Sequence, residues 1–239
     1  MTRYGQEACE MLIAGLADYP VSIVSGLALG VDTCAHKAAL AAGLHTLAVP
    51  GSGLGKDVIY PRANRALVED IVASGGGLLS EYAPDELSRP YYFPERNRLM
   101  VGLADAVLVI EAGEKSGTLI TARLAGEYNR ELLCIPHRIK DPHSFGSHLF
   151  LRLGATLVSE PLHILEALRI PPREGSRQNE APSDLTDAEG VIWGMLQEPM
   201  PRDLILRESS LGASDALTAL VALELRGLVK EEFGAWHRI

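Results

Sequence analysis

Short apolar segments that alternate with helical segments and glycine-rich loops constrain the fold of this chain more than any other feature. Buried strands are predicted at Val21–Val24, Thr46–Val49, Gly77–Ser80, Ala106–Ile110 and Leu132–Ile135. Amphipathic helices are predicted between several of them, including one that starts near Thr33 and one over Leu119–Asn129. Continuous apolar strands that alternate with helices are typical of a mainly parallel sheet covered on both faces. We therefore predict a doubly wound, Rossmann-like α/β fold.

The last quarter of the chain has a different pattern. A segment rich in proline and polar residues, 171–183, is typical of a linker. Short helices are predicted over 187–196, 201–208 and 213–225, and a strand near 227–231 returns at Trp236. Three short helices followed by a hairpin are typical of a winged helix. The predicted organisation is a Rossmann-like domain over 1–170, a linker over 171–183 and a small winged-helix-like domain over 184–239.

Composition limits the classes of protein to which the chain can belong. The 239 residues carry a net charge of −9, which argues against indiscriminate, charge-driven coating of a polyanion. No segment approaches the roughly 18 apolar residues of a membrane helix, and the first residues lack the pattern of a signal peptide. The cysteines Cys9, Cys34 and Cys134 are odd in number and scattered, which favours a reducing compartment. We expect a cytoplasmic protein without a membrane partner.

The loops that follow the predicted strands indicate where a ligand would bind. In doubly wound sheets, ligands bind beyond the carboxyl ends of the strands. The glycine-rich or polar segments 25–32, 50–60, 80–97 and 111–118 all follow predicted strands. Their convergence predicts a ligand site at that edge of the sheet.

The first of these loops reads Gly26-Leu27-Ala28-Leu29-Gly30-Val31-Asp32 and joins a strand to a helix. Glycines allow backbone amides to approach a phosphate, and the start of a helix adds a favourable dipole. The alternative is a plain tight turn in which Asp32 or Thr33 caps the helix. His36 follows Asp32 by one helical turn, and because no nucleophile or metal is evident we expect it to be hydrogen-bonded at the rim of the site.

Two further segments have the chemistry of phosphate recognition. Arg96 and Arg98 flank Asn97 at a predicted helix start, and arginine makes planar, bidentate contacts with phosphate. We expect one arginine to face the ligand and the other to form an ion pair with Glu81 or Glu111. The sequence Lys115-Ser116-Gly117-Thr118 precedes another helix and is compatible with a phosphate cradle or with a simple capping turn. It does not match a Walker A loop.

No metal or other cofactor is predicted. His137, His143 and His148 with Asp141 are candidate metal ligands, but their spacing matches no standard metal motif. The sequence also lacks the nucleophile elbow of α/β-hydrolases and the zinc-protease motif.

Taken together, these motifs resemble the DNA-processing protein A (DprA/Smf) family. The matching segments are Ser25–His36, Ile59–Pro61 with Asn64, Leu79–Tyr82, Phe93–Arg98 and Val109–Ala122, with looser matches at Gly146 and Gly154–Ala155. Their order and spacing agree over roughly residues 5–168, which is far more specific than any single motif.

The resemblance implies a Rossmann-like homodimer that binds and protects single-stranded DNA and loads the RecA recombinase onto it in natural transformation. It implies no catalytic activity and no cofactor. Carried over by motif, the DNA-binding positions are Ser25, Gly26, Leu27, Ala28, Arg96, Asn97, Arg98, Lys115, Ser116, Gly117 and Thr118. Backbone amides and a few cations can follow a phosphodiester chain without reading its sequence.

The chain departs from the family pattern in two places. Members usually open with an additional strand and a Gly-Ser-Arg loop before the first helix, and this chain begins after that point. The Rossmann-like domain is therefore expected to lack the first strand of the family. Members also commonly read Val-Pro-Gly where this chain reads Ile135-Pro136-His137.

Two other functions use similar loops. Phosphoribohydrolases of nucleoside monophosphates carry Pro-Gly-Gly-x-Gly-Thr-x-x-Glu, and here Thr121 stands where their glutamate acts. A nucleotide-binding regulatory module would instead sense a small phosphorylated ligand and act through the winged helix. Dependence of affinity on strand length distinguishes this module from a DNA-binding protein. The predicted helix 214–226 is mostly apolar, which favours protein contact over sequence reading.

Overall fold

The computed structural model describes residues 1–114, 116–172, 184–232 and 234–238. Two compact units comprise residues Met1–Pro171 and Pro172–Ile239, and each is described by itself. Most of the predicted linker, 173–183, lies outside the described residues.

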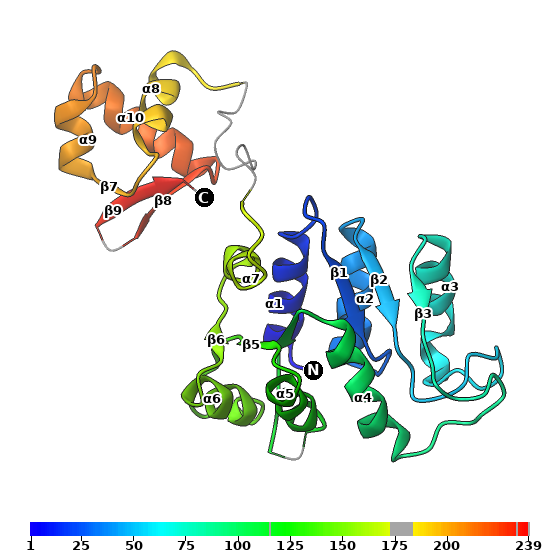
Figure 1. The fold of residues 1–239 in the computed structure, drawn as a ribbon. Helices are drawn as coiled ribbons and strands as arrows, with labels where there is room; N and C mark the ends of the chain where they lie inside the picture. Colours follow the sequence, from blue (N-terminus) through cyan, green and yellow to red (C-terminus); the bar gives the residue numbers. More distant parts are fainter. Residues whose placement is uncertain (115, 173–183, 233, 239) are drawn as a thin grey trace. The chain divides into compact units, whose positions relative to one another are not determined.

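Strands and helices alternate through the first unit, as the sequence predicts (Figure 1). In chain order the elements are α1 (Arg3–Ala14), β1 (Ser22–Ser25), α2 (Val31–Ala41), β2 (His45–Ala48), the short 3-10 helix η1 (Arg62–Asn64), α3 (Arg65–Ala73), β3 (Gly77–Leu78), α4 (Tyr92–Leu103), β4 (Ala106–Val109), α5 (Thr118–Glu127), β5 (Glu131–Cys134), α6 (Phe145–Arg152), β6 (Thr156–Leu157) and α7 (Pro161–Ala167). The last three elements, α6, β6 and α7, were not predicted, because 145–167 mixes glycine, polar and apolar residues without a clear period.

All pairing in the first unit is parallel, which confirms the predicted fold class. The strands form two three-stranded sheets, β1-β2-β3 and β4-β5-β6, where the sequence pattern suggested a single sheet. Among the described residues no backbone pairing joins β1 to β4, so each of them pairs on one side only.

One aliphatic core nevertheless connects the two sheets. α1 contributes Leu12 and Ile13, α2 contributes Ala39, and the second sheet contributes Leu133, all of them buried in a single cluster. Half-buried side chains of β1 and β4 pack against the same cluster. The first unit is therefore one packed body, and its strands end on a common side next to the loops predicted to bind a ligand.

The second unit is a winged helix, as predicted. It contains α8 (Asp187–Met195), β7 (Met200–Pro201), α9 (Arg202–Glu208), α10 (Ala213–Leu225), β8 (Val229–Glu232) and β9 (Ala235–Arg238), and its antiparallel sheet has the order β7-β9-β8. Both tryptophans of the chain, Trp193 and Trp236, are buried in its core. Thr186 and Glu189 form a reciprocal capping box that fixes the start of α8.

No helix in the described part of either unit has the length and apolar character needed to cross a membrane.

Candidate functional site

The loop after β1 is held by contacts within the protein. Leu27 has a φ of 62° and a fully buried side chain, so it turns the chain while anchoring it in the core. The Asn64 amide donates to the Leu27 carbonyl at 2.8 Å and to the Thr33 hydroxyl at 2.8 Å. The Ala28 N–H donates to Asp32 Oδ2 at 3.1 Å. Of the predicted site residues in this loop, Leu27 can therefore offer a ligand only its backbone.

The start of α2 does not have the side-chain cap of the alternative reading. Its N-cap residue is Gly30, and neither Asp32 nor Thr33 caps the helix with its side chain. Asp32 instead accepts from the loop amide of Ala28, and the Thr33 hydroxyl donates to the Ala28 carbonyl at 2.7 Å. Both side chains point back to the loop, because the chain turns sharply there.

Arg96 supports this loop from the interior of the protein. The side chain is buried, and its Nη1 donates to the Gly26 carbonyl at 2.6 Å and to the Val49 carbonyl. A Cβ at Gly26 would overlap the Arg96 guanidinium, so this position requires glycine. Burial lowers the pKa of Arg96, although the charge of Asp32 opposes the shift. Arg96 is the structural arginine of the predicted pair, with backbone carbonyls as partners rather than a carboxylate.

Asn97, the next residue on α4, faces a different loop. Its Nδ2 donates to Thr121 Oγ1 on α5 at 3.0 Å, and the Asn97 side chain is buried. The neighbouring residues Arg96 and Asn97 thus fix two separate segments to α4, namely the loop after β1 and the first turns of α5. This arrangement brings together two of the loops that the sequence predicted to converge.

Arg98 lies at the surface of the same helix. About half of its side chain is exposed, and Nη2 forms an ion pair with the Glu81 carboxylate. Glu81 raises the pKa of Arg98 through this hydrogen bond and through its charge. Glu81 is one of the two partners predicted for an arginine here. The pair is accessible, so Arg98 remains available to an anionic ligand that displaces Glu81.

The loop before α5 is more open than the loop after β1. Lys115 lies outside the described residues. The Ser116 hydroxyl accepts from the Thr118 N–H at 3.2 Å and donates to Thr118 Oγ1 at 2.9 Å, as in a capping turn. Gly117 is exposed, and a Cβ added there would meet no described atom within 4 Å. Ser116, Gly117 and Thr118 therefore border solvent at the start of a helix.

His36 is an interior residue and does not lie at the rim of the site. Its ring is fully buried, and Nδ1 is 2.7 Å from Thr46 Oγ1 on β2. Burial lowers the pKa of His36 to about 4, against an opposing effect of the Asp32 charge. The predicted rim position was wrong because α2 turns this residue towards the sheet.

The histidines of the segment after β5 contact the backbone. His137 Nε2 is 2.8 Å from the Ile110 carbonyl oxygen, and His148 Nε2 is 3.1 Å from the His137 carbonyl oxygen. Within the described ranges, no three His, Cys, Asp or Glu side chains form a group that could hold a metal ion.

An aromatic cluster beside these loops was missed in the sequence. Tyr60 and Phe93 have ring centroids 5.8 Å apart, Tyr82 stacks on Tyr92 at 3.9 Å, and Tyr91 contacts Tyr92 at 4.8 Å. We call these five residues the aromatic cluster. Tyr60 and Tyr91 are about half exposed. The signal was present, because three consecutive aromatic residues precede the arginine motif in a chain with only 5% aromatic residues.

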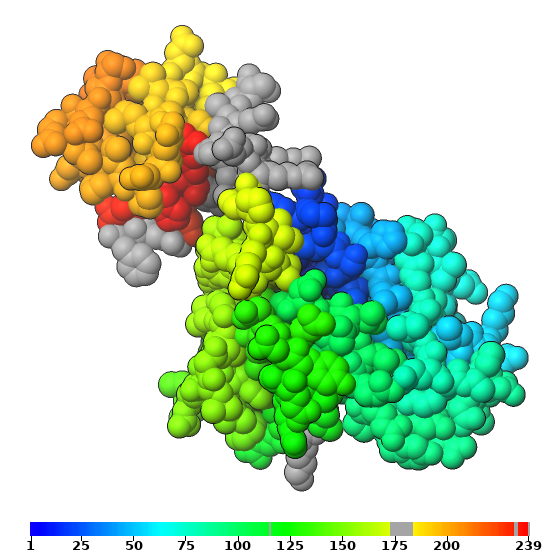
Figure 2. Space-filling view, in the orientation of Figure 1, coloured from blue at the N-terminus to red at the C-terminus, as the bar shows by residue number. Residues whose placement is uncertain are grey.

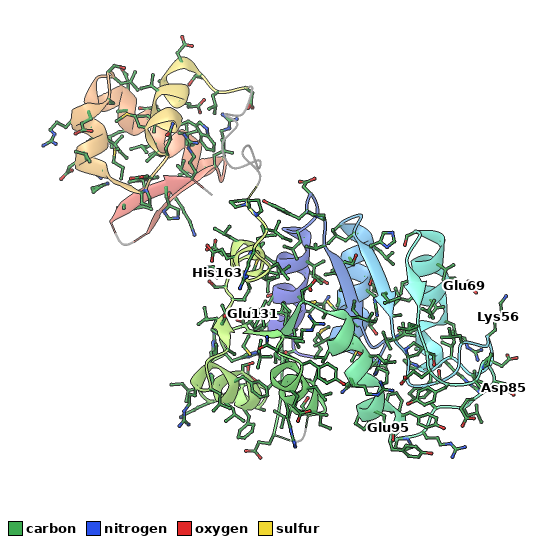
Figure 3. All side chains as sticks on the ribbon, in the orientation of Figure 1. Lys56, Glu69, Asp85, Glu95, Glu131 and His163 are labelled. Carbon is green, nitrogen blue, oxygen red and sulfur yellow. The ribbon has the colours of Figure 1, made fainter. Side chains whose placement is uncertain are left out.

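An exposed arginine lies beside the aromatic cluster. The guanidinium of Arg89 lies 5.7 Å from the ring centroid of Tyr92, and Lys56 extends from the loop after β2 (Figure 3). Backbone hydrogen bonds from Gly53 to Glu86 and from Gly55 to Pro84 join that loop to the segment before α4. The space-filling view shows the two segments in contact at one end of the first unit (Figure 2). An exposed arginine and a half-exposed tyrosine thus lie in the segment that leads into α4, the helix whose Arg96 supports the loop after β1.

Comparisons with known proteins show the family to which the chain belongs. Residues 1–169 match the family model of DNA recombination-mediator protein A, and residues 176–234 match that of the DprA winged helix domain. Protein Smf of Escherichia coli K12 is 35% identical over 99% of this chain and 64% of its own length. DNA processing protein DprA of Streptococcus pneumoniae is 44% identical over 69% of this chain and 57% of its own length. The chain therefore spans less than two thirds of these relatives.

Two solved structures share the fold of the first unit. The X-ray structure of DprA from Streptococcus pneumoniae has a TM-score of 0.64 at 41% identity and covers 70% of this chain and 57% of its own. DprA from Helicobacter pylori, which was solved for its single-stranded DNA binding mode, has a TM-score of 0.63 at 33% identity. It covers 71% of this chain and 75% of its own. With parallel strands, the supported loop and both family models in agreement, the chain belongs to the DNA recombination-mediator protein A family, whose members carry the names DprA and Smf.

Proposed function

We propose that this protein binds single-stranded DNA along the surface formed by the loop after β1, the start of α5 and the aromatic cluster. It then protects the strand and loads the RecA recombinase onto it in the cytoplasm during natural transformation. The protein acts by binding and does not transform the strand. The observation that carries the proposal is the presence of exposed arginines and exposed tyrosine rings on one surface, around a loop fixed by Arg96.

The chemistry of that surface suits an unpaired strand. Arg98 and Arg89 supply charge-assisted hydrogen bonds to phosphate oxygens. The Tyr60 and Tyr91 rings offer faces on which unstacked bases can lie, which tolerates any sequence. Duplex DNA keeps its bases stacked and hides these faces. The net charge of −9 restricts binding to this local surface and makes it depend on salt.

The glutamate partners make the surface selective for a polyanion. Arg98 is paired with Glu81 and Arg89 with Glu86, so a ligand must displace a carboxylate at each position. A single phosphate competes with one of these pairs, whereas a strand competes with both at once. Affinity should therefore rise with the number of nucleotides.

The test is the affinity for labelled oligothymidylates from one to about 35 nucleotides at two salt concentrations. We expect the affinity to rise with length and to fall with salt. The variants Arg98→Gln and Tyr91→Ala should each weaken the long complex by about tenfold, as expected for the loss of one phosphate contact or one stacked base. Arg123→Gln is the matched control, since Arg123 is an exposed arginine on α5 that is also paired with a glutamate, Glu127.

Each alternative outcome has a clear meaning. A mononucleotide that binds as tightly as the long strand would favour a nucleotide-binding regulatory module. Equal losses in Arg98→Gln and Arg123→Gln would show that the surface has been placed wrongly. Loading is measured separately, as the rate at which RecA nucleates on a strand with and without this protein. An unchanged rate would remove the loading role and leave the binding role.

We also propose that the protein forms a homodimer through the face around α6 and β6. Large apolar side chains are exposed there, among them Ile139, Phe145, Leu153 and Leu157. Monomers rarely expose contiguous apolar surface of this kind. The molar mass in solution tests the proposal, with Leu153→Glu expected to give the monomer. A wild-type monomer at high concentration would contradict it.

A further inference from the structure

A pocket of about 440 Å³ lies between the first turn of α1 and the segment that follows β5. It is lined by Tyr4, Pro136, His137, Arg138 and Asp141. Its volume is within the range of small-molecule sites in proteins. None of the five residues belongs to the proposed strand surface, so the pocket needs an explanation of its own.

The His137 side chain is inaccessible to solvent, and only one of its two ring nitrogens has a hydrogen-bond partner. Nε2 is 2.8 Å from the Ile110 carbonyl oxygen. A carbonyl oxygen can only accept, so Nε2 carries the proton, and Nδ1 of the neutral ring is an acceptor. Within the described residues no donor reaches Nδ1. A buried acceptor without a donor is unfavourable and rare in folded proteins.

The carboxylate of Asp141 lies beside this nitrogen and is a second acceptor. Its Oδ2 is 3.9 Å from His137 Nδ1, which is too long for a hydrogen bond. Oδ1 accepts from the His143 N–H at 2.8 Å, which orients the carboxylate. The Asp141 side chain is partly exposed and lines the pocket. Two acceptors, one of them charged, therefore lie side by side with no described donor between them.

Tyr4 and Arg138 complete the pocket. The Tyr4 hydroxyl donates to the Pro136 carbonyl at 2.7 Å, and its ring centroid lies 5.2 Å from that of His137. Burial raises the pKa of Tyr4, and the charge of Asp141 raises it further. Arg138 is exposed, and its side chain forms no hydrogen bond or ion pair within the described part of the chain. The pocket thus combines an aromatic wall, a carboxylate and an unpaired guanidinium.

A primary ammonium group is the donor that fits this arrangement. It has three N–H groups and can donate to two acceptors at once. It also neutralises Asp141, which a hydroxyl or an amide group would leave charged. No third His, Cys, Asp or Glu side chain in the described ranges joins His137 and Asp141, which favours an organic cation over a metal ion. The guanidinium of Arg138 repels a second positive charge and attracts a carboxylate.

We propose that this pocket binds a small amino acid as its zwitterion. The ammonium group donates to Asp141 Oδ2 and to His137 Nδ1, and the carboxylate of the ligand pairs with Arg138. The aliphatic part of the ligand lies against Pro136 and the ring of Tyr4. His137 Nδ1 is covered in the free protein, so the Asp141 side chain rotates as the ammonium group enters.

Calorimetric titration of the protein with glycine, 4-aminobutanoate and 6-aminohexanoate tests the proposal. The three ligands differ in the distance between ammonium and carboxylate. Each is compared with the amine and with the carboxylic acid of the same chain length. We expect at least one amino acid to bind about tenfold more tightly than either partial ligand, because only the amino acid satisfies Asp141 and Arg138 together. No binding in the series, or equal affinity of amine and amino acid, would overturn the proposal.

The variant Asp141→Asn distinguishes this pocket from an unspecific surface effect. Asparagine keeps an acceptor for the His143 N–H and brings an N–H donor next to His137 Nδ1. The variant should therefore bind the amino acid at least about tenfold more weakly, and its thermal midpoint should rise as the buried acceptor gains a partner. Asp70→Asn is the matched control, since Asp70 is an exposed carboxylate on α3, and it should change neither quantity.

The variant Arg138→Gln tests the other end of the ligand. It should lower the affinity for the amino acid to that for the amine and leave the affinity for the amine unchanged or higher. Undiminished binding of the amino acid in Asp141→Asn or in Arg138→Gln would overturn the proposal. These titrations contain no nucleic acid, so their outcome is independent of the proposed DNA binding.

Discussion

The loop after β1 and the loop before α5 both follow a strand, both precede a helix and both contain glycine. The first is nevertheless packed against the interior of the protein, whereas the second is exposed. Around the first loop, Gly26 is pressed against the Arg96 guanidinium, and Asn64 holds the Leu27 carbonyl. Around the second, Gly117 has no described atom near its missing side chain, and the Ser116 hydroxyl bonds with its neighbour Thr118. The same local motif therefore serves as a fixed scaffold in one place and as an accessible surface in the other.

The difference shows that a glycine-rich loop does not by itself identify a contact surface. Whether such a loop is a contact surface depends on whether protein atoms or solvent occupy the space beside the glycine. Gly26 lacks a side chain because the interior of the protein occupies that space. Gly117 has room for a side chain, so its exposed backbone is free to meet a ligand. In the first loop a substitution should act mainly on stability, and in the second mainly on binding.

The largest expected effect is that of Gly26→Ala. The added methyl group must displace a buried guanidinium, which we expect to destabilise the protein by about 3 kcal/mol or more. Gly117→Ala is the matched control and should change stability by less than about 0.5 kcal/mol. Urea unfolding of both variants measures the contrast. Similar losses in the two variants would contradict the distinction between scaffold and surface.

The next prediction concerns His36, which lies beneath the first loop. Its pKa is about 4 in the folded protein and near 6.5 when unfolded, so the unfolded chain binds a proton first as the pH falls. The contribution of His36 to the free energy of unfolding should therefore be fully present above pH 6.5. It should decrease towards pH 4, by about 3 kcal/mol in total. His36→Asn should flatten the pH dependence in that window. The measurement is the free energy of unfolding of both proteins as a function of pH. Parallel curves would show that His36 does not cause the loss of stability at low pH.

A smaller effect is expected where α4 meets α5. Asn97→Ala and Thr121→Val each remove one partner of a partly buried hydrogen bond, which should cost about 1–2 kcal/mol. The double variant should cost less than the sum of the two, because both single changes break the same bond. A double-mutant cycle measures this coupling. Full additivity would mean that the Asn97–Thr121 hydrogen bond does not couple α4 to α5.

The smallest effect is expected for Ser116→Ala in the second loop. The hydroxyl accepts from one N–H at the start of α5, and its loss should cost about 0.5–1 kcal/mol. Strand affinity should fall more noticeably than stability, since the turn presents the exposed backbone of Gly117. Affinity for a long oligothymidylate and the unfolding midpoint are compared in one variant. A change in stability without a change in affinity would restrict this loop to a capping role.

The sequence predicted the alternation of strands and helices well, because apolar strands and amphipathic helices leave distinct local patterns. It predicted α10 over Ala213–Leu225 to the residue. It could not predict the division into two sheets, because whether β1 and β4 pair depends on how distant segments of the backbone pack. It also missed α6 and α7, where the helical pattern is weak.

The structure shows how the side chains of the predicted site are oriented, which the sequence could not. The sequence indicated that one of the two arginines would be structural, and burial in the fold identified it as Arg96. His36 was misplaced because periodicity alone does not say which face of α2 meets the sheet. The aromatic cluster was missed since the pairs Tyr60–Phe93 and Tyr82–Tyr92 join residues that are separated in sequence and meet only after folding. The residue types of the site follow from the local sequence, whereas the orientations of their side chains are set by tertiary packing.

The placement of both tryptophans in the winged helix has a spectroscopic consequence. Trp193 and Trp236 lie in the core of the second unit, whereas the aromatic residues around the proposed strand surface are tyrosines and one phenylalanine. Fluorescence excited selectively in tryptophan therefore reports only on the winged helix. Tyrosine emission reports mainly on the first unit. A single unlabelled sample can thus show whether the two units melt together, and which of them responds when a strand is added.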